Sequence, residues 1–285
     1  MKKVLCSLFL MASFVLNANA ATTTTTKTNT YVPSDRVETV GKQIISKNNL
    51  PTVTFKVTET AASNADIATT NVLYINKQDL NYTGNDNEVA AVIAQEFGAV
   101  INSSATKNKA FANLTTAIAG NVTSENLQNA AALANTLSKT SMSTKQQMNA
   151  DVTGCDLMIA AGYNPLAMIV VLGKMDGSVM EAISGTPANI KRTMNIYDYL
   201  SYNYPSKVTA GYGCKEYKNF VAYIEPTIKE RNSNSKKLAK FKKEQAKLKL
   251  QRSKDLAKYK ATGGTTGWDA SYTILQNLMN SSETK

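Results

Sequence analysis

The chain has 285 residues, 43% of them hydrophobic, which is enough to bury the core of one large domain or two smaller ones. It has no histidine, no phosphate-binding loop and no dinucleotide fingerprint, which excludes Ser-His and Cys-His hydrolases and the common nucleotide-binding enzymes. The net charge of +11 is concentrated between Lys229 and Lys260, where thirteen basic and three acidic residues occur, so the rest of the chain is close to neutral.

The N-terminus has the order of a secretory signal peptide. Lys2 and Lys3 precede an apolar run from Val4 to Leu16, and small residues up to Ala20 follow. The run is shorter than the roughly 20 apolar residues that a transmembrane helix needs. We therefore expect cleavage after Ala20 and export to the periplasm, the cell surface or the medium.

The mature chain is expected to begin with a threonine-rich, flexible segment at 21–33. Apolar residues that recur at helical spacing then predict a helix that Ser34 caps and that ends before Pro51. Alternation of apolar and polar residues predicts a short strand around Val53, Phe55 and Val57, and a second strand is predicted at Val72–Asn76.

The stretch Asn85–Ser104 predicts a core helix, because its apolar residues recur at three- and four-residue steps. Asn85 and Asp86 are suitable caps for its first turn. On this helix Gln95, Glu96 and Ala99 occupy the three defining positions of the zinc-protease motif HExxH. In that motif two histidines hold the metal and the glutamate activates water, and here both histidines are missing.

Further helices are predicted along the rest of the chain. They are expected at 111–119, 124–137, 146–161, 166–175, 190–202 and 215–224. The fold class is therefore α+β and mostly helical. Cys155 and Cys214 are the only cysteines after the signal, and the sequence is compatible both with one disulfide and with two free thiols.

Four stretches, taken together, carry a resemblance to a known family. They are Asn64-Ala65 with the strand Val72–Asn76, the helix Glu88–Val100, Gln147–Asp151 with Gly154 and the turn Ala161–Pro165, and Tyr204–Lys207 with Tyr212. Their order resembles metallopeptidase family 48, which contains HtpX and the CAAX prenyl proteases. The resemblance covers about 34–226 and implies a zincin-like fold with a small edge sheet, whose exposed strand lines the substrate groove.

The chain departs from the family at the residues that bind the metal in the family. The resemblance implies zinc ligands at Gln95, Ala99 and Gln147, where the family has two histidines and a glutamate. Amide oxygens are neutral and alanine offers no donor, whereas zinc sites are built from imidazole, thiolate and carboxylate. Glu96 keeps the general-base position as a vestige, and Asp151 keeps the position that orients a metal ligand. A structural interpretation is also open, in which Glu96 is hydrogen-bonded to Gln95 or Gln147 and Asp151 to a backbone group.

The C-terminal part is expected to add a basic helical arm at 227–262 and a short amphipathic segment at 263–285, after a metallopeptidase-like domain at 34–226. Lys236–Lys260 combines strong helix formers with a thin apolar stripe that Gln245 and Arg252 interrupt. Such a long basic helix can lie on an anionic membrane surface, grip an acidic partner, or pack on the body as a solvated arm. Nucleic acid is not expected as a partner of an exported chain.

These observations leave three functional hypotheses. The first is an exported, catalytically inactive pseudopeptidase without metal or cofactor, which binds a polypeptide or an envelope partner through strand addition at Val72–Asn76. The second is a zinc-dependent metalloendopeptidase with atypical ligands. The third is a surface or envelope interaction protein that acts through its basic C-terminal helix.

Overall fold

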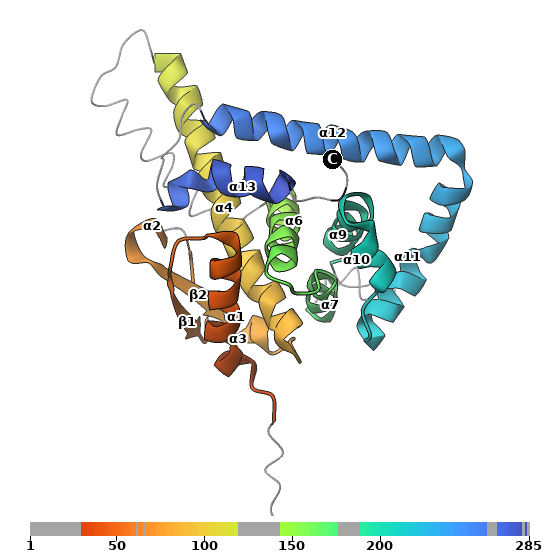
Figure 1. Ribbon diagram of the computed structural model, residues 1–285, viewed down its shortest axis with the longest axis horizontal. Coiled ribbons are helices and arrows are strands. Elements are labelled where there is room, and N and C mark those ends of the chain that lie inside the picture. Colours follow the sequence, from red (N-terminus) through yellow and green to blue (C-terminus); the bar gives the residue numbers. More distant parts are fainter. Residues whose placement is uncertain are drawn as a thin grey trace, which may run out of the picture. The chain divides into compact units, whose positions relative to one another are not determined.

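The computed structural model describes residues 30–60, 62–64, 67–118, 143–175, 189–260, 267–280 and 283. The chain divides into two units, Met1–Thr30 and Tyr31–Lys285, and the description below concerns the second. Its described part is mostly helical and includes one two-stranded sheet, so the α+β class is confirmed (Figure 1). The predicted signal peptide and the predicted helix at 124–137 lie outside the described residues.

The first elements form a helix packed beside a small sheet. Helix α1 (Pro33–Asn48) begins one residue before the predicted cap, because the fixed φ of Pro33 starts the first turn. The prediction that Ser34 caps the helix was therefore wrong: the cap residue is Val32, which makes no side-chain capping bond. Strands β1 (Thr54–Thr58) and β2 (Val72–Asn76) confirm the two predicted strands and pair in parallel.

Two short helices flank β2, and a long helix follows. Helices α2 (Ile67–Thr70) and α3 (Lys77–Leu80) lie before and after the strand. Helix α4 (Asp86–Ile118) is the predicted core helix, and the side chain of Asn85 accepts hydrogen bonds from the backbone N–H groups of Asn87 and Glu88. The separate helix predicted at 111–119 was wrong, since residues 102–110 contain no glycine or proline and α4 runs through them.

The second half adds the remaining helices. They are α6 (Thr144–Ala160), α7 (Ala167–Lys174), α9 (Ile190–Asn203), α10 (Pro205–Ala210), α11 (Lys215–Ser233), α12 (Ser235–Lys260), η1 (Gly267–Ala270) and α13 (Ser271–Asn280). Helix α11 extends beyond its predicted end at Ile224 with Pro226 inside it, because Ile228 still packs against the core and Arg231 binds Asp198 of α9. The boundary predicted at 226 lies within this helix, and the domain division stays a prediction.

The C-terminal elements pack on the core. The ring of Trp268 stacks on Phe97 of α4 with ring centroids 5.6 Å apart, and Phe97 in turn meets Phe55 of β1 edge to face. Helix α13 lies beside α4 and α6, and its Leu275 and Leu278 are buried (Figure 1). Within the described ranges, no helix is long and apolar enough to cross a membrane.

Candidate functional site

The candidate site lies where α4 crosses α6, and two glycines set the distance between these helices. A Cβ atom added to Gly98 would lie 2.2 Å from the carbonyl oxygen of Ala150, and one added to Gly154 would lie 2.9 Å from that of Ala94. The two backbones are therefore in direct contact, which only glycine allows at these positions. Asn102 of α4 reinforces the crossing by donating to the hydroxyl of Thr153, 3.0 Å away.

The predicted site residues lie on the segments that meet at this crossing. Gln95, Glu96 and Ala99 are partly exposed, whereas almost all their neighbours on this part of α4 are buried. Gln147 is also partly exposed, on the first turns of α6. Asp151, one turn further along α6, is fully buried. The structure thus brings the family's metal-ligand segments together and separates Asp151 from solvent.

Glu96 is held by an asparagine from the loop before α2. Asn64 donates from Nδ2 to Oε2 of Glu96 at 2.7 Å and to the carbonyl oxygen of Tyr74 at 3.0 Å. The Asn64 Oδ1 atom accepts the backbone N–H of Tyr74 at 2.8 Å. One amide therefore connects the middle of β2 with the glutamate of α4, and uses both hydrogen-bonding groups of the Tyr74 backbone.

The environment of Glu96 favours the protonated carboxyl group. Burial raises the pKa of Glu96 from 4.5 to about 7, the hydrogen bond from Asn64 partly opposes this rise, and the charge of Asp79 adds to it. No cation is among the causes that shift this pKa. A carboxyl group of this kind can exchange a proton near neutral pH, but activating water for hydrolysis in this family also requires the metal.

The residues at the implied zinc positions do not fit the metal. Gln95 and Gln147 provide neutral amides, Ala99 provides no donor atom, and the whole chain lacks histidine. Within the described ranges, no group of three or more histidine, cysteine, aspartate or glutamate side chains is close enough to hold a metal ion. The donor set of this chain therefore disagrees with the zinc chemistry of its relatives, and we assign no reaction step to a metal.

Asp151 has an ionic partner that the sequence did not reveal. Arg192 of α9 binds the carboxylate of Asp151 through two hydrogen bonds, from Nε at 2.9 Å and from Nη2 at 2.6 Å. Burial raises the pKa of Asp151, and the guanidinium group of Arg192 opposes that rise. Asp151 therefore holds α9 against α6, and its partner is a side chain rather than a backbone group.

A second buried carboxylate on α6 was missed by sequence reasoning. Asp156 accepts hydrogen bonds from the hydroxyl groups of Tyr199 and Tyr204 at 2.7 Å, and Nη1 of Arg252 approaches it to 3.4 Å. Arg252 comes from α12 and also donates to the hydroxyl of Thr153 at 2.9 Å. The available signal was the position of Arg252 on the apolar stripe of α12, where a charged residue needs a buried partner.

The two cysteines are free thiols. Cys155 is buried in α6, and Cys214 accepts the backbone N–H of Tyr217 at the start of α11.

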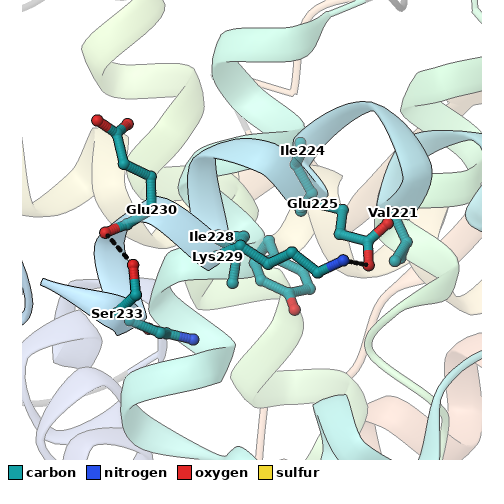
Figure 2. Close-up of a pocket in the computed structure, with 9 residues that line it drawn as sticks. Val221, Ile224, Glu225, Ile228, Lys229, Glu230 and Ser233 are labelled. Carbon is teal, nitrogen blue, oxygen red and sulfur yellow. Dashed lines mark hydrogen bonds and ion pairs between the residues drawn. The ribbon is translucent and has the colours of Figure 1, made fainter.

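A groove of about 530 Å³ lies along α11, between Tyr197 of α9 and the α11 side chains that Figure 2 labels. Its rim carries the ion pair of Lys229 and Glu225. None of the residues predicted for the site lines this groove.

The crossing combines a core helix carrying a glutamate, a second helix with a buried aspartate, and a short parallel sheet beside them, which is the arrangement that the four sequence stretches predict for a peptidase-like protein. Comparison with family models supports this class, because the model of Peptidase family M48 matches residues 32–202. The chain therefore belongs to peptidase family M48. Neither the curated proteins nor the solved structures include a significant match to it.

Proposed function

We propose that this chain is a catalytically inactive member of family M48 that binds a polypeptide or an envelope protein instead of cleaving it. The observation that carries the proposal is the replacement of the whole ligand set by Gln95, Ala99 and Gln147 in a chain without histidine. Loss of three ligands at once removes the ion that generates the nucleophile in zinc peptidases. We further propose that the chain is exported, on the evidence of its N-terminal sequence.

The proposed contact is the free edge of β2. Among the residues that the structure describes, this strand pairs with β1 alone, and the backbone groups of Tyr74 that point away from β1 bond to the side chain of Asn64. An extended peptide that adds to β2 must therefore displace the amide of Asn64. Because amide and peptide offer the same donor and acceptor, the exchange costs little hydrogen-bond energy. Asn64 thus protects the edge until a polypeptide replaces it.

The rival function is a zinc endopeptidase with atypical ligands, and metal content separates the two. We expect no stoichiometric zinc in the purified chain by mass spectrometry and no chelator-sensitive cleavage of casein. As a control, Gln95→His, Ala99→His and Gln147→Glu together restore the family's ligand set, and this triple variant is expected to bind zinc stoichiometrically. Stoichiometric zinc in the unchanged chain, with cleavage lost in Glu96→Gln, would refute the proposal.

Binding is measured separately from chemistry. Reduced, fluorescently labelled casein serves as an extended polypeptide, and its anisotropy reports binding to the full chain. The proposal requires binding that persists with chelator present and in Glu96→Gln. Binding that chelator abolishes would instead indicate a metal-dependent site, and complete absence of binding would remove the polypeptide as the partner class.

A further inference from the structure

Helix α12 has two chemically different faces. The residues that turn toward the body recur at three- and four-residue steps and are partly buried: Leu238, Phe241, Gln245, Lys249 and Arg252. On this face the guanidinium carbon of Arg231 lies 3.8 Å from the ring centroid of Phe241, and Arg252 reaches the buried Asp156. The inner face of α12 is therefore committed to the fold.

The opposite face carries a line of lysines, which we name the lysine ridge. It consists of Lys236, Lys240, Lys243, Lys247 and Lys254, all of them exposed and separated by steps of four, three, four and seven residues. At 1.5 Å per residue the ridge is about 27 Å long and follows one side of the helix. Leu250, with 56% of its surface exposed, fills the turn between the last two lysines.

The positive charge of the lysine ridge is not balanced by acidic side chains of the same face, as it is on an ordinary solvent-exposed helix. No acidic residue lies on the ridge itself, and the nearest, Glu244, approaches only Lys240, at 3.9 Å. A face that serves solubility alone usually mixes both signs, because like charges at neighbouring turns of a helix repel. A continuous single-sign ridge is instead a complement to an extended negative surface.

The kind of basic residue distinguishes the possible negative surfaces. The arginines of this region, Arg231 and Arg252, face inward into ion pairs with Asp198 and Asp156, whereas the outward cations are all lysines. Protein interfaces favour arginine and aromatic residues and are depleted in lysine. Lysine is a flexible point charge without the planar fork that recognises a single carboxylate, and it suits a diffuse layer of charge.

We propose that the lysine ridge of α12 docks the protein on a membrane surface that contains anionic lipids. The ammonium groups contact the lipid headgroups, and the exposed Leu250 beside them adds apolar contact at the interface. Helix α12 stays on the body, because its inner face is already occupied, so attachment is peripheral and salt-sensitive. This inference does not depend on the loss of peptidase activity.

Vesicle sedimentation of the mature chain that begins at Ala21 tests the proposal. We expect the chain to sediment with vesicles of phosphatidylcholine and phosphatidylglycerol, to remain in solution with phosphatidylcholine alone, and to be released by high salt. The triple variant Lys240→Gln, Lys243→Gln, Lys247→Gln is expected to bind roughly a hundredfold more weakly, at about fivefold per lysine.

A matched variant controls for net charge. Lys145→Gln, Lys207→Gln and Lys218→Gln removes the same charge at exposed positions outside α12, and should bind like the unchanged chain. Equal weakening of both triple variants would overturn the ridge as the docking surface. Binding of soluble polyglutamate in preference to the anionic vesicles would overturn the lipid surface and favour an acidic protein. Thermal unfolding should show that all variants are folded, because the substituted side chains are exposed.

Discussion

Carboxyl groups lie on both helices of the crossing, and Asp151 and Asp156 of α6 are compensated in a different way from Glu96 of α4. On α6, Asp151 binds Arg192, and Asp156 binds Arg252 together with two tyrosine hydroxyls. On α4, Glu96 receives a hydrogen bond from the amide of Asn64, and no cation is among the causes that shift its pKa. Burial raises the pKa of all three groups, but the guanidinium groups oppose the rise on α6 alone. The α6 carboxylates therefore serve packing, whereas Glu96 is a carboxyl group that titrates near neutral pH in the region of the family's chemistry.

The largest expected effect comes from removing the guanidinium group that compensates Asp151. Arg192→Ala leaves a fully buried carboxylate without its ionic partner, so we expect the free energy of unfolding to fall by about 3 to 5 kcal/mol. Urea unfolding at neutral pH measures the change. Arg36→Ala is the matched control, because Arg36 binds Asp86 with the same two-bond geometry but both side chains are nearly 40% exposed. That substitution should cost less than about 1 kcal/mol, and equal losses would contradict the difference in burial.

Replacing Glu96 should have the opposite sign. The pKa of Glu96 is about 7 in the folded chain and 4.5 when unperturbed. Between these two pH values the folded state therefore holds a proton that the unfolded state has released. The contribution of Glu96 to stability is therefore fully present below pH 4.5 and is lost as pH rises to about 7. Glu96→Gln resembles the protonated form, and we expect it to stabilise the protein by up to about 3 kcal/mol above pH 7 and by little below pH 4.5.

Urea unfolding across this pH range checks the prediction for Glu96. Glu244→Gln is a suitable control, because Glu244 is exposed on α12 and its substitution should leave the pH profile unchanged. A Glu96→Gln variant whose stability followed the unchanged chain at every pH would show that the pKa of Glu96 is the same in the folded and unfolded states. The comparison between Glu96 and the α6 carboxylates would then fail.

Much of this architecture follows from local sequence patterns, whereas the partners of the buried charges do not. Periodicity located α4, α6 and both strands, because each of these elements buries one regular face. It missed the continuity of α4 and the extension of α11 through Pro226, where tertiary packing outweighs a local signal. The bond between Asp151 and Arg192 joins residues 41 positions apart, and nothing local encodes such a pairing.

A smaller loss of stability is expected where Arg252 attaches α12 to the body. Arg252→Ala removes the cation near Asp156 but leaves the hydroxyls of Tyr199 and Tyr204, so we expect a loss of about 2 kcal/mol, smaller than for Arg192→Ala. Hydrogen exchange should accelerate in α12 more than in α6, because the inner face loses its ionic contact. Lys254→Ala, on the exposed face of the same helix, is the control and should leave exchange unchanged. Equal exchange in both variants would show that apolar contacts alone hold α12.

The smallest stability effect is expected at Asn64, where the β2 edge and Glu96 meet. Asn64→Ala deprives Glu96 of its hydrogen bond, and because that bond lowers the pKa of Glu96, the pKa should rise above about 7. Solvent can replace the lost bonds at a sheet edge, so the cost in stability should be about 1 kcal/mol. The same substitution exposes the N–H and C=O of Tyr74 and should tighten the binding of labelled casein. Unchanged casein affinity, with a shifted pKa of Glu96, would place the polypeptide contact away from β2 and leave the α4 region without a binding role.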